Sequence, residues 1–128
     1  MLFLCLYACL PVNINNAEEV IIYELGVSAE ESRIFIHIVK NGRVTIDQIS
    51  SLIGCSHERG SQLANSLVNN GMIIEIKSNE YECLHPRFAI TNRYRKRCEE
   101  DNIVFKKNSK IDNLGLVLET PYNNARNK

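Results

Sequence analysis

The sequence predicts an α+β, mostly helical domain, a winged helix-turn-helix with a two-stranded wing and an extra C-terminal helix. Two amphipathic helical patterns are separated only by Gly54-Cys55-Ser56, and a short turn containing glycine is typical of a helix-turn-helix. The second pattern ends at Gly71 and is followed by two short alternating runs, which suit a hairpin. A further helix is expected to start at Pro86, because proline favours the first helical position.

Residues typical of helix ends mark the first two predicted helices. A short helix is expected from Glu18 to Leu25, stopped by Gly26. Ser28 and Glu31 then form a capping-box pattern that starts the second helix. This helix stops at Asn41-Gly42, and its apolar stripe consists of Ile34, Phe35, Ile38 and Val39.

The next two helices form the predicted helix-turn-helix. After a brief extended step at Val44, Thr45 is a good N-cap for a helix over residues 46–53. Ser56 caps a second helix that runs to Asn70. Its inward face is expected to hold Gly60, Leu63, Ala64 and Leu67. Glycine at position 60 costs about 0.5–1 kcal/mol of helix stability relative to alanine, but it permits close helix packing.

The wing is predicted over residues 72–84. Met72, Ile74 and Ile76 alternate with Ile73, Glu75 and Lys77, and a second run alternates around Tyr81 and Cys83. The loop between the runs is as short as Ser78-Asn79, and asparagine tolerates the positive φ that such a turn requires.

Composition divides the chain into four expected segments. These are an apolar N-terminal segment over residues 1–16, the winged domain over 17–85, a C-terminal helix over 86–103 and a disordered tail over 104–128. The tail is rich in Asn and Lys and has one short apolar island, Leu114 to Leu118. The stripe of Ile90, Tyr94 and Cys98 on the C-terminal helix suits either core packing or a dimer seam.

The compartment is inferred from the cysteines and the N-terminal segment. Five scattered cysteines do not suggest a disulfide framework, so we expect a reduced, cytoplasmic protein. Residues 1–10 are apolar but fall well short of the roughly 20 residues that span a bilayer. They suit packing on the domain, a weak membrane tether, or an upstream extension translated from a misplaced start. We expect no membrane partner.

Four segments of the chain share a pattern with a known family. They are Leu25-Gly26-Val27-Ser28, Lys40-Asn41-Gly42-Arg43-Val44-Thr45-Ile46, Ile53-Gly54-Cys55-Ser56 and Leu67-Val68-Asn69-Asn70-Gly71-Met72-Ile73. These segments resemble the TrmB-type winged-helix transcription regulators, a family best known from archaea. The resemblance covers roughly residues 18–100 and implies a DNA-binding domain only, because the chain is too short for the sugar-sensing domain of larger members.

The candidate DNA-binding surface is the outward face of the 56–70 helix, with the wing beside it. A helix advances about 100° per residue, so the positions opposite the apolar stripe face outward. Gln and Asn pair with adenine, Arg with guanine and Glu with cytosine. The alternative interpretation is a solvated polar face. The candidate contacts are Arg43, Ser56, His57, Glu58, Arg59, Ser61, Gln62, Asn65 and Lys77.

The net charge and the placement of basic residues leave several binding partners open. Lys plus Arg and Asp plus Glu each total 15, so no global attraction to double-stranded DNA is expected, and a homodimer would double the few phosphate contacts. A basic cluster on the 86–100 helix, Arg93, Arg95, Lys96 and Arg97, suits DNA backbone, an acidic protein partner, or simple complementarity to the helix dipole. The rival function is a winged-helix protein-interaction module of a transcription-related complex.

No catalytic constellation is visible in the sequence. The sequence has no pattern of a nucleophile with a base, of paired carboxylates in an apolar setting, or of a Gly-rich phosphate loop. The histidines, His37, His57 and His85, lie far from any paired-cysteine spacing that would suit zinc. We therefore expect no enzyme activity, no metal and no cofactor.

Overall fold

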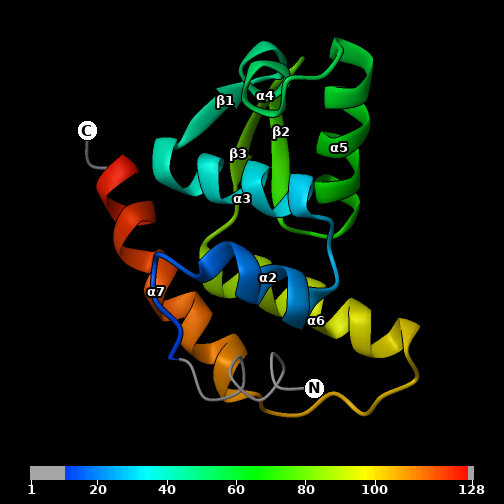
Figure 1. The fold of residues 1–128 in the computed structure, drawn as a ribbon, viewed down its shortest axis with the longest axis vertical. Helices are drawn as coiled ribbons and strands as arrows, with labels where there is room; N and C mark the ends of the chain where they lie inside the picture. Colours follow the sequence, from blue (N-terminus) through cyan, green and yellow to red (C-terminus); the bar gives the residue numbers. More distant parts are fainter. Residues whose placement is uncertain (1–10, 127–128) are drawn as a thin grey trace.

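Helices surround a small sheet in the computed structural model, which describes residues 11–126 (Figure 1). The prediction for the apolar segment at residues 1–10 lies outside these residues. The elements in chain order are α2 (Ala17–Leu25), α3 (Ala29–Asn41), β1 (Arg43–Thr45), α4 (Ile46–Ile53), α5 (His57–Asn69), β2 (Ile73–Lys77), β3 (Glu80–Cys83), α6 (Pro86–Glu100) and α7 (Ser109–Arg126). The predicted fold class, a mostly helical winged helix-turn-helix, is confirmed.

Local side-chain signals set the helix starts. Ser28 and Glu31 form a complete capping box at α3, in which each side chain bonds the other residue's backbone amide. Thr45 and Gln48 do the same at α4. At α5 the Ser56 hydroxyl accepts a hydrogen bond from the third amide of the helix, at 3.1 Å. All three caps were predicted from the sequence.

The turn between α4 and α5 depends on glycine. Gly54 has φ 76° and ψ 38°, in the left-handed region, and its amide donates to the Ser50 carbonyl at 2.8 Å. Cys55 follows, and Ser56 immediately caps α5. The chain therefore turns within the predicted three residues, and α4 packs against α5.

The sheet has three antiparallel strands in the order β1-β3-β2. The two-stranded wing, β2 and β3, closes through Ser78 and Asn79, and Asn79 has φ 63° as the short loop requires. The brief extended step at Val44 became β1, which joins the outer edge of the wing by pairing with β3.

The faces of β2 differ from the expected alternation. The alternation placed Ile74 with Met72 and Ile76 on one face. In the structure Ile73 is 1% exposed and Ile74 is 43% exposed. Met72 lies outside the strand, and a register irregularity separates Glu75 from Lys77. Met72 and Ile73 are both buried, although they are neighbours in the sequence. Because Met72 precedes the strand, it does not share the strand's period of two, and within β2 the buried position is Ile73.

The predicted disordered tail over residues 104–128 is wrong for most of its length, because residues 109–126 form α7. One stripe of α7 is buried, and the helix packs against α6, α3 and α2. The buried side chains recur at intervals of three or four residues and extend the Leu114 to Leu118 island in both directions. They are Ile111, Leu114, Leu118 and Tyr122.

The hydrophobic core joins the winged domain to its C-terminal helices. Helix α3 lies at its centre, between the sheet and the α2, α6 and α7 layer (Figure 1). On α6, Ile90 is completely buried, Cys98 is nearly so, and Tyr94 packs partly buried against the same core. This stripe of α6 therefore serves core packing and does not form an exposed dimer seam.

Candidate nucleic-acid interface

Helix α5 buries one face and exposes the other. Its buried stripe, Gly60, Leu63, Ala64 and Leu67, packs toward α3, α4 and β2, as predicted. The opposite face is open to solvent, with Glu58, Gln62, Asn65 and Asn69 exposed and Ser61 partly covered. This exposed face is a row of carboxylate and amide groups that carries both hydrogen-bond donors and acceptors.

Two side-chain contacts join the start of α3 to α5. The Ser66 hydroxyl donates to Glu31 Oε2 at 2.7 Å, and Arg59 Nη2 lies 3.0 Å from Glu30 Oε1. The guanidinium of Arg59 thus turns back toward α3. Both members of the Arg59 ion pair are about half exposed, so the contact adds little stability and can be exchanged for another anion.

The N-terminal end of α5 presents its first residues to solvent. Ser56 and His57 are exposed, and His57 Nε2 lies 3.9 Å from Asp47 Oδ1 of α4. The unpaired amides of a first helical turn carry a partial positive charge, which favours an anion such as phosphate. Asp47 and Glu58 place negative charge beside the same turn.

The wing carries mixed charge. Lys77 is exposed at the end of β2, next to the loop of Ser78 and Asn79. Glu75 Oε2 accepts the Asn79 amide at 3.1 Å, and Glu80 begins β3. The tip of the wing therefore offers one lysine between two glutamates.

Arg43 lies apart from the other predicted contacts. It is on β1, at the opposite sheet edge from β2, and its Nε is 3.7 Å from Glu82 Oε2. Arg126 of α7 also pairs with Glu82. Arg43 therefore belongs to an ion-pair cluster that joins the sheet to α7. The structure brings together the residues on α5 but does not bring Arg43 to them.

Close packing of α4 on α5 depends on Gly60. A methyl group added at this position would lie 2.5 Å from the Ser50 hydroxyl, and the Ser50 Cβ is 3.7 Å away. Ser50 donates only a weak hydrogen bond, at 3.4 Å, to the Ser56 carbonyl, so its hydroxyl can rotate away. The space beside Gly60 thus accommodates a methyl group after a small adjustment and nothing larger.

Replacing Gly60 by valine should lower the free energy of unfolding by about 1–3 kcal/mol, because the extra carbons force α4 and α5 apart. Urea denaturation followed by circular dichroism measures the change. In the matched double variant Ser50→Ala with Gly60→Ala the clash is absent, and alanine's helix preference should leave stability equal to or higher than that of Ser50→Ala. Equal stability of Gly60→Val and the original protein would contradict the packing argument.

The basic cluster on α6 is used mainly inside the protein, a role that sequence reasoning did not single out. Arg93 Nε donates to the Leu25 carbonyl at 2.8 Å, and Lys96 Nζ donates to the Asn69 carbonyl at 3.3 Å. Arg97 donates to the Tyr23 carbonyl. These carbonyls lie at the C-terminal ends of α2 and α5, where the helix dipole favours cations. Arg95 instead stacks over the ring of Phe105, at 5.0 Å.

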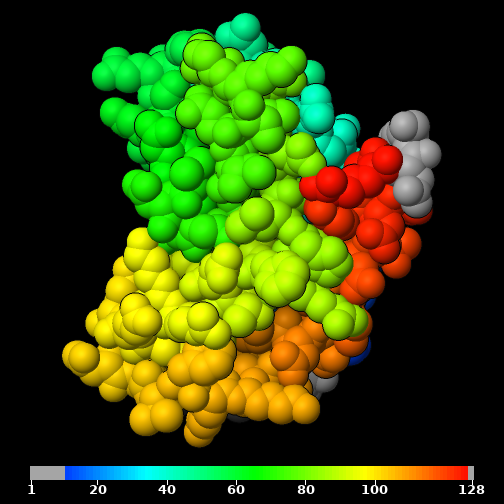
Figure 2. Space-filling view, turned by 180° about the vertical axis from the view of Figure 1, so that it is seen from behind, coloured from blue at the N-terminus to red at the C-terminus, as the bar shows by residue number. Residues whose placement is uncertain are grey.

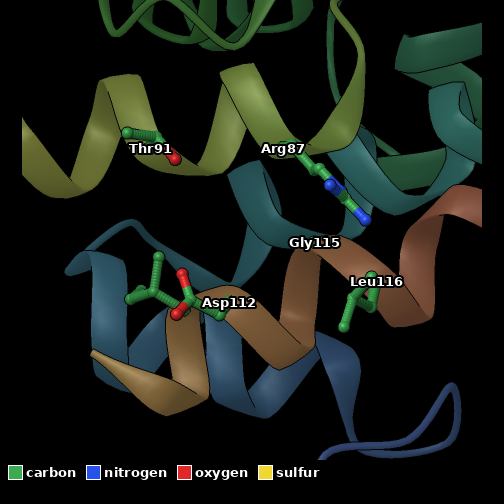
Figure 3. Close-up of a pocket in the computed structure, with 6 residues that line it drawn as sticks. Arg87, Thr91, Asp112, Gly115 and Leu116 are labelled. Atoms are coloured by element: carbon green, nitrogen blue, oxygen red, sulfur yellow. The ribbon is translucent and has the colours of Figure 1, made fainter. Parts of the chain in front are cut away.

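A hollow of about 250 Å³ lies between α6 and α7, and no residue of α5 or the wing lines it (Figure 3). Gly115 allows the close crossing there, because a methyl group on it would lie 3.2 Å from Arg87 Cγ. Arg87 also pairs with Glu119 across the helices, at 3.1 Å. The hollow is lined by Arg87, Thr91, Ile111, Asp112, Gly115 and Leu116.

The cysteines and histidines form no metal centre in residues 11–126, where no group of three or more His, Cys, Asp or Glu side chains converges. Burial raises the pKa of the Cys83 thiol to about 12, so this thiol stays protonated and unreactive at neutral pH. Cys55 is half buried in the turn before α5.

The comparison with known families identifies the chain's family. A family model described as "Sugar-specific transcriptional regulator TrmB" matches residues 22–95, which is more than half of the 128 residues. The chain belongs to the TrmB family. The matched segment runs from within α2 into α6 and contains α4, α5 and the wing. Searches of curated proteins and of solved structures returned no match.

Membership of the TrmB family indicates a transcriptional regulator with a DNA-binding domain of the helix-turn-helix type. Helix α7 lies beyond the matched segment. None of the helices in the described part of this TrmB-family chain is both long and apolar enough to cross a membrane.

Proposed function

We propose that this TrmB-family chain regulates transcription by placing α5 in the major groove of duplex DNA, with the β2–β3 wing alongside. The observation that carries the proposal is the position of Glu58, Gln62 and Asn65. They are exposed on the face of α5 opposite its buried stripe, and α5 follows the helix-turn-helix turn.

The exposed groups match the chemistry of base edges. Gln62 and Asn65 can each pair with the N6 and N7 atoms of adenine, and Glu58 can accept a hydrogen bond from the amino group of cytosine. Each good bidentate pair contributes about 1–3 kcal/mol of discrimination. Arg59 can exchange Glu30 for guanine, because its ion pair with Glu30 is half exposed.

Phosphate contacts are expected from Ser56, the first amides of α5, His57 and Lys77. These are few for one protomer, and affinity for DNA comes largely from cations that displace counterions. A homodimer would double them and would set the spacing of two half-sites, about one helical turn apart. We therefore propose that the DNA-bound form is a homodimer.

The test is an electrophoretic shift with pooled duplexes, comparing the original protein with the double variant Gln62→Ala and Asn65→Ala. Loss of two base contacts should weaken binding to the selected duplex by at least about 30-fold. The matched control, Asn123→Ala with Asn124→Ala, removes two exposed amides from α7 and should leave binding unchanged. Affinity should also fall as salt rises. Unchanged binding by the α5 variant would reject α5 as the recognition helix.

A protein-interaction module is the second candidate, because acidic groups accompany the same surface. Asp47, Glu58, Glu75 and Glu80 lie on or beside α5 and the wing. Such charge repels phosphates and suits a basic protein surface. Hydrogen exchange separates the two functions. Protection of residues 57–69 by duplex DNA supports the first, and protection only by a co-purified protein supports the second.

A further inference from the structure

The linker between α6 and α7 exposes three consecutive apolar side chains. Ile103 is 57% exposed, Val104 79% and Phe105 45%. Lys106 and Lys107 follow and are also exposed. These five residues are here called the linker patch. The patch follows α6 at the end of the molecule opposite the wing, as the yellow and orange region of Figure 2 shows.

The linker patch contains two lysines and no acidic side chain. Arg95 lies over the Phe105 ring and adds a third cation beside the two lysines. Of the three acids at the end of α6, Asp101 pairs with Arg97, Glu100 pairs with Arg93, and Glu99 is exposed. Glu24 of α2 lies near the C-terminal end of the linker, where its Oε2 accepts a hydrogen bond from Asn108. Residues 102–111 contain no acidic side chain. The patch thus combines an apolar tip with a cationic border.

This combination of an apolar tip and a cationic border limits which kind of partner can bind the linker patch. Duplex DNA offers phosphates but no apolar layer for Ile103 and Val104. A second copy of the chain in a symmetric contact would bring like charges together. The surface of an anionic bilayer offers both parts, because apolar side chains enter the boundary of the acyl chains while lysine ammonium groups meet the phosphates.

We propose that the linker patch docks on an anionic lipid surface, with Ile103, Val104 and Phe105 inserted and Lys106 and Lys107 at the headgroups. This goes beyond DNA binding and replaces the expectation of no membrane partner. That expectation rested on the length needed to span a bilayer, whereas docking requires no spanning helix. The patch and the proposed DNA surface lie at opposite ends of the molecule, so the two contacts are compatible (Figure 1).

Vesicle sedimentation with the full chain tests the proposal. The protein should sediment with vesicles of phosphatidylglycerol and phosphatidylcholine at low salt and stay in solution with phosphatidylcholine alone. Ile103→Ser with Val104→Ser should lower the partition coefficient by at least about tenfold, because two side chains lose their apolar burial. Lys106→Glu with Lys107→Glu should lower it by at least about tenfold as well.

Matched variants control for general effects. Phe88→Ser removes another exposed apolar side chain, and Arg33→Glu with Lys40→Glu makes the same charge change elsewhere. Both should bind vesicles like the original protein. All variants should keep the original circular dichroism spectrum, and the linker-patch variants should keep the original DNA shift, so the outcome is independent of the proposed function.

Several results would overturn the proposal. One is that the original protein does not sediment with the anionic vesicles. Another is binding that the linker variants leave unchanged, which would assign the contact to another part of the chain, since these variants keep residues 1–10. A third is loss of binding in the lysine variant alone, which indicates adsorption without insertion. A loss of self-association in the Ile103 and Val104 variant, measured by ultracentrifugation without lipid, would assign the patch to a dimer.

Discussion

Replacing Leu114 and Leu118 together by alanine is expected to lower the free energy of unfolding by about 4–10 kcal/mol. Each leucine is completely buried on α7, and truncating such a side chain costs about 2–5 kcal/mol. Since a domain of this size is stable by only about 5–15 kcal/mol, much of the variant should be unfolded without denaturant. Urea denaturation followed by circular dichroism and by intrinsic tyrosine fluorescence measures the loss.

The control lies on the same helix. Leu116 is 50% exposed between the two buried leucines, and Leu116→Ala should change stability by less than about 0.5 kcal/mol. Leu116→Ala is the same leucine-to-alanine change on the same helix. It differs from the other two substitutions only in the burial of the leucine side chain. If the double variant were as stable as Leu116→Ala, α7 would not be part of the core, and the disordered tail predicted from composition would be correct after all.

The failure to predict α7 has a physical cause. Its buried residues are single apolar side chains among Asn, Lys, Asp and Glu, and only Leu114 to Leu118 stand close enough to look like a segment. Pro121 lies within the helix and argues against one when read locally. What makes α7 helical is the surface of α6, α3 and α2 that its stripe covers, and that surface exists only after the other helices have formed.

Features encoded within a few residues were predictable. The caps at Ser28, Thr45 and Ser56, the left-handed turn at Gly54 and the loop at Asn79 each depend on one or two neighbouring side chains. The structure has all of them at the predicted positions. The outward face of α5 followed in the same way, because the positions opposite a buried helical stripe are fixed by the 3.6-residue period.

The partners of the charged residues were not predictable, because they come from distant parts of the chain. Arg59 meets Glu30, 29 residues earlier, and Arg43 joins a cluster completed by Arg126 of α7. No local pattern indicates such pairs. The charge count could show that cations are scarce near α5, but only the folded chain shows that most of the α6 cluster is occupied internally.

Replacing Arg93 by alanine is expected to lower the free energy of unfolding by about 3 kcal/mol. Arg93 is only 8% exposed although it is charged, and its guanidinium bonds groups from three places in the chain. They are the Leu25 carbonyl at 2.8 Å, Asn70 Oδ1 at 3.2 Å and Glu100 Oε1 at 3.0 Å. Truncation leaves these acceptors without their donor, and losing a buried hydrogen bond to a charged group costs about 1.5–3 kcal/mol.

The matched control for Arg93 is Arg95→Ala, two residues along the same helix. Arg95 is exposed and its guanidinium lies over the Phe105 ring, so its loss should cost less than about 1 kcal/mol. Denaturation curves in urea compare the two variants. Equal, small losses would show that the α6 cluster acts only through the helix dipole. A large loss confined to Arg93 would show that it ties α6 to the ends of α2 and α5, and therefore that α5 depends for its position on a residue outside the winged domain.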